Sequence, residues 1–283
     1  MSFVTPKKML LDAQKGGYAI GAFNVENMEM VLAVVAAAEE LKAPVMLQTT
    51  PSTVKYASLD MFHAMVSARA KKASVPVALH LDHGTAFDLV ADAIEVGYTS
   101  VMIDGSHDSF EMNVEKTKKV VEFAKTKGIP VEAELGKVGG KEDDLESEGN
   151  ANTDPKEAQV FVERTGVDSL AIGIGTAHGF YAGEPVLEKE LVSKIREVVD
   201  IPLVLHGASG LSAEDVKECI ARGMCKVNFA TELRVAFTDA TKKLYKENPD
   251  VFDPKKSGKL SMEAVKEMVK SRIMICGSAG KGE

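Results

Sequence analysis

The chain has 283 residues, 45% of them hydrophobic and 27% charged, which is an ordinary globular composition. Its net charge of −8 argues against a general nucleic-acid surface, which needs a basic face, but leaves room for a local phosphate pocket. No apolar run approaches the ~18 residues of a membrane span, and the N-terminus lacks a signal-peptide core. The three cysteines show no CxxC spacing and are typical of free thiols, so we expect a cytoplasmic protein.

Short β-branched runs alternate with longer amphipathic patterns from end to end. Strands are predicted at 18–23, 45–49, 76–82, 100–104, 130–134, 168–173, 202–206 and 225–229. Helices are predicted at 27–42, 58–73, 85–96, 110–127, 154–165, 187–199, 212–222 and 230–246. Their expected N-caps include Ser58, Thr85, Asp154 and Ser212. This alternation predicts parallel βαβ units in one α/β domain, residues 1–283, folded as a (β/α)8 TIM barrel. A doubly wound open sheet is the rival, but no G-x-G-x-x-G follows the first strand.

Two segments fall outside the repeat. Residues 136–152 form a long, acidic loop after the fifth strand, and we expect it to act as a lid with Gly139 and Gly140 as its hinge. The tail, residues 260–283, adds an extra C-terminal helix from Ser261 to Met274.

Three histidines follow predicted strands at the points where those strands end: His83, His178 and His206. The carboxyl ends of barrel strands gather on one face, so the three imidazoles should converge there. They therefore predict a catalytic metal with an open coordination position. His80 is expected inside the barrel, near the ligands, and His63 on a surface helix.

Carboxylates stand at the same strand ends. Asp82 and His83 are neighbours, so both can face the site only if the strand bends there. Asp82 is then either a general acid–base or an orienter of a ligand histidine. Asp104, Glu132 and Glu134 would repel one another without a cation, which indicates either a second metal position or neutralisation by the inward-facing Lys226.

The last two strand ends have the composition of a phosphate site. Residues 206–210 read His-Gly-Ala-Ser-Gly, and residues 228–231 read Asn-Phe-Ala-Thr at the start of a helix. Small residues let backbone N–H groups approach an anion, which the helix dipole also favours. Together these residues predict a metal-dependent barrel enzyme that acts on a phosphorylated carbonyl compound.

Over essentially its whole length, the chain resembles the class II, metal-dependent ketose-bisphosphate aldolases. The resemblance is carried by Leu-His-Leu-Asp-His-Gly (79–84), Ser-Val-Met-Ile-Asp-Gly-Ser-His (100–107), Val-Glu-Ala-Glu-Leu-Gly (131–136), Gly-Gly-Lys-Glu-Asp-Asp (139–144), Gly-Thr-Ala-His-Gly (175–179), Leu-Val-Leu-His-Gly-Ala-Ser-Gly (203–210) and Lys-Val-Asn-Phe-Ala-Thr-Glu-Leu (226–233). The last three, with Cys-Gly-Ser-Ala (276–279), look most like the tagatose-1,6-bisphosphate branch.

The resemblance implies reversible cleavage of a ketose 1,6-bisphosphate to dihydroxyacetone phosphate and glyceraldehyde 3-phosphate. Zinc would polarise the ketone and stabilise the ene-diolate, bound by His83, His178 and His206. Asp104 and Glu134 would form a second metal position, and the family also admits a monovalent cation. Asp82 would take the proton of the C4 hydroxyl, and Glu142 in the lid would exchange the C3 proton.

The resemblance also implies the residues that hold the substrate. The dihydroxyacetone-phosphate site would consist of Gly179, Gly207, Ala208, Ser209, Asn228, Phe229, Ala230 and Thr231. Thr50 would lie near the substrate, and Arg272 would reach the second phosphate, in some relatives from a neighbouring subunit.

Three alternatives stay open. Tagatose relatives often read Asp-His-His where this chain has Asp82-His83-Gly84, as fructose enzymes do, so a fructose-1,6-bisphosphate aldolase is one of them. A Schiff-base aldolase would need a strand-end lysine, for which only Lys226 is available. The chain could also be a subunit or scaffold that works with a companion subunit. By resemblance we expect a homo-oligomer, either a dimer or a tetramer.

Overall fold

The computed structural model describes residues 2–142, 145–147, 151–181 and 183–282, and for residues 141, 142 and 145–147 it describes the backbone alone. Eight of its strands form a closed barrel of parallel pairs, in which β1 and β11 close the ring through the pair Ile20↔Lys226. In chain order these strands are β1 (Ile20–Asn24), β2 (Val45–Thr49), β3 (Val77–Gly84), β4 (Ser100–Ile103), β5 (Val131–Leu135), β8 (Ser169–Ile172), β10 (Leu203–Leu205) and β11 (Met224–Phe229). The predicted (β/α)8 TIM barrel is confirmed.

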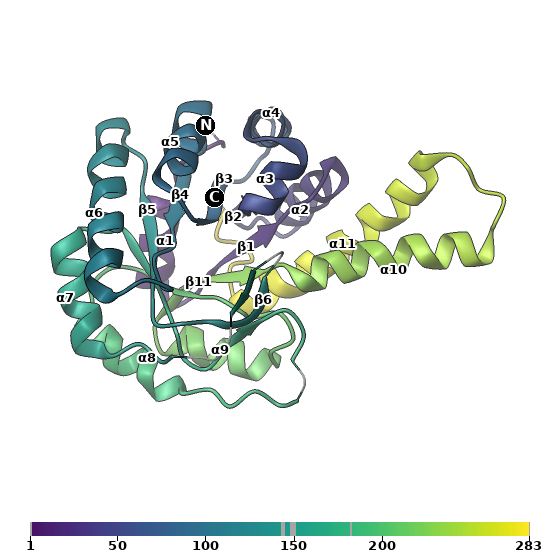
Figure 1. Ribbon diagram of the computed structural model, residues 1–283. Coiled ribbons are helices and arrows are strands. Elements are labelled where there is room, and N and C mark those ends of the chain that lie inside the picture. Colours follow the sequence, from purple (N-terminus) through teal and green to yellow (C-terminus); the bar gives the residue numbers. More distant parts are fainter. Residues whose placement is uncertain (1, 143–144, 148–150, 182, 283) are drawn as a thin grey trace.

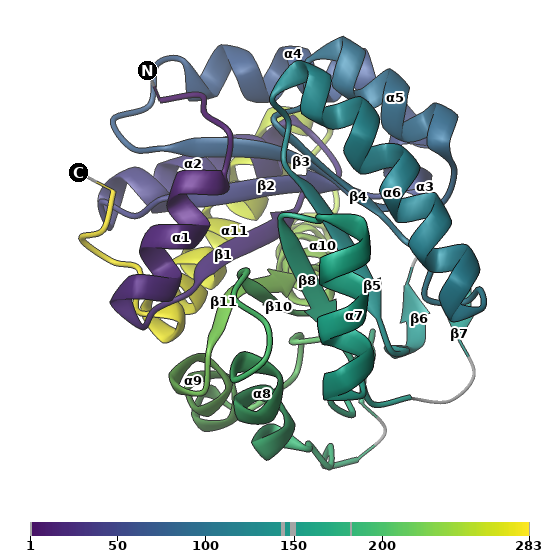
Figure 2. The ribbon, with the colours of Figure 1, turned by 90° about the vertical axis from the view of Figure 1, so that its left-hand side faces the viewer.

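Helices surround the barrel (Figure 2) and cover the outer side of its strands. They are α2 (Met28–Glu40), α3 (Pro51–Ala57), α4 (Leu59–Ala70), α5 (Phe87–Val96), α6 (Phe110–Lys127), α7 (Pro155–Thr165), α8 (Lys189–Arg196) and α9 (Ala213–Ala221). The first helix, α1 (Lys7–Gly16), instead packs in a separate buried cluster with Ile20, Ala22 and Met46. The sequence analysis did not predict α1 or α3. None of the described helices is both long enough and apolar enough to cross a membrane.

Three of the four expected caps begin their helices. Ser58 accepts from the N–H of Met61, Asp154 from that of Glu157, and Ser212 from that of Asp215. The prediction for Thr85 is wrong, because α5 begins after Ala86, whose side chain offers no acceptor.

The extra C-terminal helix is longer than predicted. α11 (Pro254–Cys276) begins at Pro254, where Asp253 caps it by accepting from the N–H of Lys255. Its polar first turns hid it from a search for apolar periodicity. It packs against α10 (Thr231–Glu247), and the two helices form an arm that projects from the barrel (Figure 1).

The described part of the 136–152 loop is not irregular. β6 (Gly139–Glu142) pairs antiparallel with β7 (Leu145–Ser147) and parallel with β9 (Ala177–His178). Gly140 lies directly beside His178, at φ +89°, and a Cβ there would lie 2.3 Å from the His178 carbonyl oxygen. The hairpin therefore rests on the strand that carries one of the three converging histidines.

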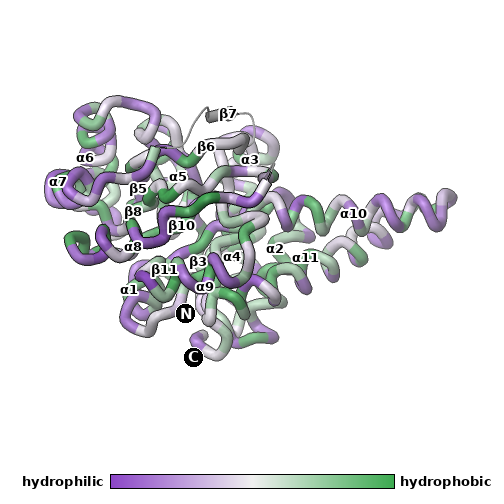
Figure 3. The backbone as a smooth tube through the Cα atoms, turned by 90° about the horizontal axis from the view of Figure 1, so that it is seen from below, coloured by the Kyte–Doolittle hydropathy of each residue, from purple (hydrophilic) through white to green (hydrophobic). Residues whose placement is uncertain are grey.

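The main hydrophobic core lies between the barrel and its helices. Strand residues there, such as Leu79, Val101 and Leu170, are fully buried. In the hydropathy view (Figure 3) the far end of the α10–α11 arm is hydrophilic, away from this core. The inside of the barrel also holds polar side chains that are almost fully buried: Gln48, His80, Asp82, Glu132, Glu134, His206 and Lys226.

Candidate active site

The three strand-end histidines converge as predicted. His83 is the second-to-last residue of β3, His178 is in β9, and His206 directly follows β10. One ring nitrogen from each lies within 4.8 Å of the others. This is a distance at which three imidazoles can share one ion.

A distortion of β3 lets Asp82 and His83 serve the same site. His83 has φ +49°, and the pairing of β3 with β4 shifts register between Leu81 and Gly84. The predicted bend is therefore present. A non-glycine residue at positive φ is uncommon and is often found where function imposes it.

Carboxylates orient two of the histidines. His83 Nδ1 lies 2.7 Å from Asp104 Oδ2, and His206 Nε2 lies 3.0 Å from Glu132 Oε1. Burial raises the pKa of Asp104, but hydrogen bonds from His83 and Ser106 outweigh it and hold that pKa well below its usual range. Such carboxylate–histidine pairs fix the ring and its tautomer beside a metal.

Glu132 is itself held by the buried Lys226, whose Nζ lies 2.8 Å from Oε2. Burial raises the pKa of Glu132, but Lys226 outweighs it and the pKa falls well below its ordinary value. The expectation that Lys226 neutralises one of the carboxylates is confirmed. His80 is buried beside Glu132, and its Nδ1 forms a hydrogen bond of 2.8 Å with Ser100 Oγ.

The geometry around His206 suits a cation. Its Nδ1 lies 2.9 Å from Glu134 Oε2, yet among the described residues neither atom has a hydrogen bond of good geometry. With Nε2 protonated toward Glu132, Nδ1 presents a lone pair to a carboxylate oxygen. Two acceptor atoms repel each other at this distance, and a metal ion bound by both would remove that repulsion. Burial lowers the pKa of His206, but Glu132 and Glu134 outweigh it and raise the pKa to about 9, so Nδ1 carries a proton unless a metal ion takes the place of that proton.

Three amide side chains hold the carboxylate of Asp82. Asn24 and Gln48 each donate to Oδ2 at 3.0 Å, and Asn228 donates to Oδ1 at 3.2 Å. The carboxylate is buried, so these donors stabilise its charge and fix its direction. The sequence analysis missed Asn24 and Gln48, although Asn24 directly follows one predicted strand and Gln48 lies late in the next.

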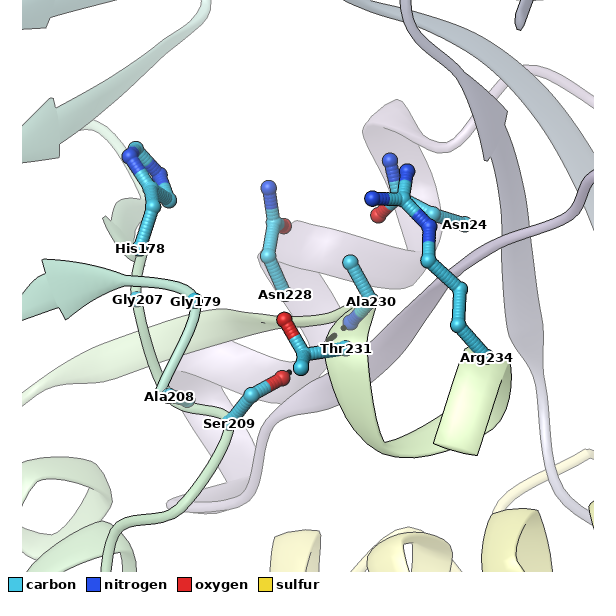
Figure 4. A pocket seen from close by; sticks show the side chains of 10 residues that line it. All are labelled: Asn24, His178, Gly179, Gly207, Ala208, Ser209, Asn228, Ala230, Thr231 and Arg234. Atoms are coloured by element: carbon cyan, nitrogen blue, oxygen red, sulfur yellow. Dashed lines mark hydrogen bonds between the residues drawn. The ribbon is translucent and has the colours of Figure 1, made fainter. Parts of the chain in front are cut away.

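A pocket beside the histidines contains most of the predicted phosphate site. Figure 4 shows the ten residues that line it, from Asn24, His178 and Gly179 to residues 207–209, Asn228, Ala230, Thr231 and Arg234. Ser209 Oγ accepts from the N–H of Ala230, which ties the two loops together. Thr231 is the first residue of α10, so the positive end of that helix dipole faces the pocket.

The loop after β10 has no room for a side chain at its glycine. Gly207 has φ +67°, and a Cβ there would lie 2.7 Å from the Ala177 carbonyl oxygen. Tyr181, also missed in the sequence, donates to the Gly207 carbonyl at 2.7 Å and accepts from the N–H of Ala177 at 2.9 Å. The phosphate loop and the His178 strand are thereby held against each other.

Comparison with known proteins agrees with this geometry. The family model for class II fructose-bisphosphate aldolase matches residues 4–281. The chain belongs to the class II fructose-bisphosphate aldolase family. It is therefore an enzyme, a carbon–carbon lyase of a metal-dependent family whose substrates are phosphorylated sugars.

Solved structures of three similar proteins have the same fold. The YdjI aldolase from Escherichia coli K12 is 41% identical at a TM-score of 0.88, over 99% of this chain and 100% of that one. A putative fructose-1,6-bisphosphate aldolase from Coccidioides immitis is 31% identical at 0.89, over 98% of both chains. Fructose-bisphosphate aldolase from Campylobacter jejuni is 23% identical at 0.85, over 99% of this chain and 97% of that one, and supports the fold alone.

The other predicted aldolase residues lie around this pocket or outside it. Thr50 caps α3 and contacts Thr53, with 3.1 Å between the hydroxyl oxygens. Phe229 is buried and stacks on Phe23, with 5.7 Å between the ring centroids, so its side chain faces the helices. Glu142 ends β6, but its side chain lies outside the described part of the chain.

Arg272 is engaged within the chain. Its Nε donates to Glu232 Oε2 at 2.6 Å and its Nη2 to Oε1 at 2.7 Å, and Glu232 also accepts from the N–H of Gly210. The guanidinium lies 5.8 Å from the centre of the Phe229 ring. Its role at the second phosphate stays a prediction.

Proposed function

We propose that this class II aldolase reversibly cleaves a ketose 1,6-bisphosphate, with tagatose 1,6-bisphosphate favoured, to dihydroxyacetone phosphate and glyceraldehyde 3-phosphate. The proposal depends above all on one arrangement: three histidine nitrogens within 4.8 Å of one another, with Asp82 and a phosphate-type pocket beside them. The ion we propose for His83, His178 and His206 is zinc, which imidazole nitrogens favour.

When bound, zinc supplies a Lewis acid that polarises the substrate ketone and offsets the negative charge that develops there. The loops after β10 and β11 would bind the phosphate at C1 through backbone N–H groups and the start of α10. This anchoring would set C3 and C4 beside Asp82.

Asp82 would remove the proton of the C4 hydroxyl while the C3–C4 bond breaks, so that C4 becomes the aldehyde of glyceraldehyde 3-phosphate. The electron pair of that bond stays with C3, and Glu142 would return a proton to C3 to complete dihydroxyacetone phosphate. The amides of Asn24, Gln48 and Asn228 hold the carboxylate of Asp82 in one orientation before the reaction.

Asp104 and Glu134 support a second position for a divalent ion, because with His83 they form another group whose ligand atoms lie within 4.8 Å. The substrate-binding roles of Gly179, residues 207–209, residues 228–231, Thr50 and Arg272 belong to the same proposal. So does a dimeric or tetrameric assembly. A catalytic subunit that needs a companion subunit for full activity is a further alternative.

Fructose 1,6-bisphosphate is the second candidate, and the exit of β3 favours it. The two sugars differ only in configuration at C4, which Asp82 would touch. Gly84 is packed so closely that a Cβ would lie 2.5 Å from the Met102 carbonyl oxygen. The Asp-His-His sequence of tagatose relatives therefore has no room here without a backbone shift.

The test is a coupled cleavage assay on both sugars, each run with chelator and again after zinc is restored. Zinc-dependent cleavage of either sugar supports the aldolase, and the ratio of kcat/KM values identifies the preferred one. Folded, zinc-loaded protein that cleaves neither sugar, alone or with a candidate companion subunit, would overturn the proposal.

A further inference from the structure

Tyr181 bridges two backbone segments, one beside the proposed metal site and one in the proposed phosphate site. Its hydroxyl accepts a hydrogen bond from the N–H of Ala177 at 2.9 Å and donates one to the carbonyl of Gly207 at 2.7 Å. Ala177 immediately precedes the histidine His178, and Gly207 immediately follows His206. One side chain therefore connects the backbones next to two of the three converging histidines.

The phenol of Tyr181 is suited to this bridge. A phenol hydroxyl can donate and accept at the same time, and here it does both. Burial raises the pKa of Tyr181 more than the hydrogen bond from Ala177 lowers it, so the hydroxyl keeps the proton that it donates to Gly207. The ring packs over Gly210, where a Cβ would lie 3.3 Å from the ring atom Cδ2. This packing helps to hold the hydroxyl between the two segments.

His178 depends on contacts outside the barrel more than the other two histidines do. His83 lies in the barrel strand β3, and His206 directly follows the barrel strand β10. His178 lies in β9, which belongs to the small sheet of β6, β7 and β9 rather than to the barrel. The position of His178 relative to His83 and His206 is therefore set by contacts other than the barrel ladder, and the bridge from Tyr181 to Gly207 is one of them.

The other end of the bridge lies in the loop that would bind the C1 phosphate. Residues 207–209 line the pocket together with His178 and Gly179 (Figure 4). Gly179 and Gly207 have φ of +85° and +67°, and glycine loses more backbone entropy than other residues when its conformation is fixed. An anion that binds the N–H groups of this loop would supply part of that order, and Tyr181 would extend it to the strand that carries His178. A second ligand that binds to an already ordered site loses less entropy.

We propose that Tyr181 is a positioning residue that couples the two sites, so that phosphate bound at the loop after β10 raises the affinity of the three histidines for zinc. This inference rests on the zinc and phosphate sites of the proposed function. The coupling is reciprocal, because zinc must then raise the affinity for phosphate by the same factor. The enzyme would hold its ion most tightly while a phosphorylated substrate or product occupies the pocket.

The experiment measures zinc affinity in wild type, Tyr181→Phe and Tyr245→Phe, each with and without saturating inorganic phosphate. Zinc is held by a competing chromogenic chelator that is calibrated in each buffer, at free zinc too low to precipitate. Phenylalanine keeps the ring over Gly210 and removes only the hydroxyl. Tyr245, whose hydroxyl contacts Ser257 near the far end of α10, is the matched control.

In wild type we expect phosphate to raise zinc affinity about tenfold, which is the size that the two hydrogen bonds of Tyr181 allow. In Tyr181→Phe the gain should fall to about twofold, because only the direct attraction between ion and anion remains. Tyr245→Phe should keep the gain of wild type.

A gain in Tyr181→Phe equal to that of wild type would overturn the inference, even if zinc bound more weakly in both buffers, because a merely structural role weakens binding equally with and without phosphate. A wild type whose zinc affinity does not respond to phosphate would overturn it as well. Wild-type protein that binds neither zinc nor phosphate would instead contradict the proposed function itself.

Hydrogen exchange of zinc-free wild type tests the same inference without a variant, and decides it if Tyr181→Phe does not fold. Phosphate should slow exchange of the Ala177 amide, because its N–H donates to Tyr181 and an anion in the pocket would reach it only through that bridge. Unchanged exchange of this amide on phosphate binding would show that Tyr181 does not transmit order to the strand that carries His178.

Discussion

Lys226 and Glu132 form an ion pair inside the barrel, with Nζ 2.8 Å from Oε2 and both side chains almost completely buried. The pair joins β11 to β5 across the barrel, and Glu132 continues to His206. A buried charge that loses its partner is far more costly than an exposed one.

Lys226→Met should therefore lower the free energy of unfolding by about 3–5 kcal/mol, measured by urea denaturation. Lys242→Met, which removes an exposed lysine, should change it by less than about 1 kcal/mol. The double variant Lys226→Met with Glu132→Gln should recover part of the loss. If Lys226→Met and Lys242→Met were equally stable, the buried ion pair would contribute no more to stability than an exposed lysine does.

Strand-end residues made much of this site predictable from the sequence. The rule that barrel strands end on one face was enough to bring His83, His178 and His206 together, and alternation along the strand placed Lys226 inside. The bend at His83 followed because Asp82 and His83 could not otherwise share a site.

Contacts between distant segments were not predictable in the same way. The hairpin of β6 and β7 joins β9 where Gly140 pairs beside His178, and its polar sequence has no apolar periodicity from which such pairing could be predicted. Arg234 looked like an ordinary helix residue, since its position depends on Glu26, more than two hundred residues earlier. Such partners become visible only when the barrel closes.

His206 should be necessary for metal binding. Because one ring nitrogen of His206 lies within 4.8 Å of those of His83 and His178, His206→Ala should reduce bound zinc, measured by atomic emission after dialysis, together with activity. His63→Ala, on α4, should keep its zinc and serves as the control. An alanine variant of His206 with full zinc content would remove this residue from the ligand set.

Gly140 should matter for His178 although it has no side chain. In Gly140→Ala the new Cβ would meet the His178 carbonyl oxygen at 2.3 Å, so β6 and β9 must move apart. We expect zinc affinity to fall at least about tenfold, as when a ligand loses its support. Gly128→Ala has a similar φ, +70°, but open space around it, so it should cost about 1–2 kcal/mol of stability without affecting zinc. Equal zinc affinities in the two variants would contradict this role of the hairpin.

The cysteines should be unreactive in the native protein. Burial raises the pKa of Cys276 to about 12 and that of Cys219 to about 11, so few thiolates exist at pH 8. Labelling with a chromogenic disulfide should be slow in buffer and should reach all three thiols in denaturant. Rapid native labelling of Cys276 would show that the end of α11 opens readily.

Asp82 is the residue whose role the structure allows to be separated from metal binding. Asp82→Asn keeps the size of the side chain but cannot take a proton, and one of its neighbouring amides would lose its acceptor. We expect kcat to fall by about 10²- to 10⁴-fold with zinc content unchanged, because general base catalysis is lost while the histidines remain. Asp108→Asn, which alters a surface pair with Lys116, is the matched control. Near-normal kcat in Asp82→Asn would leave this carboxylate as an orienting residue, and the base would have to be sought elsewhere around the metal.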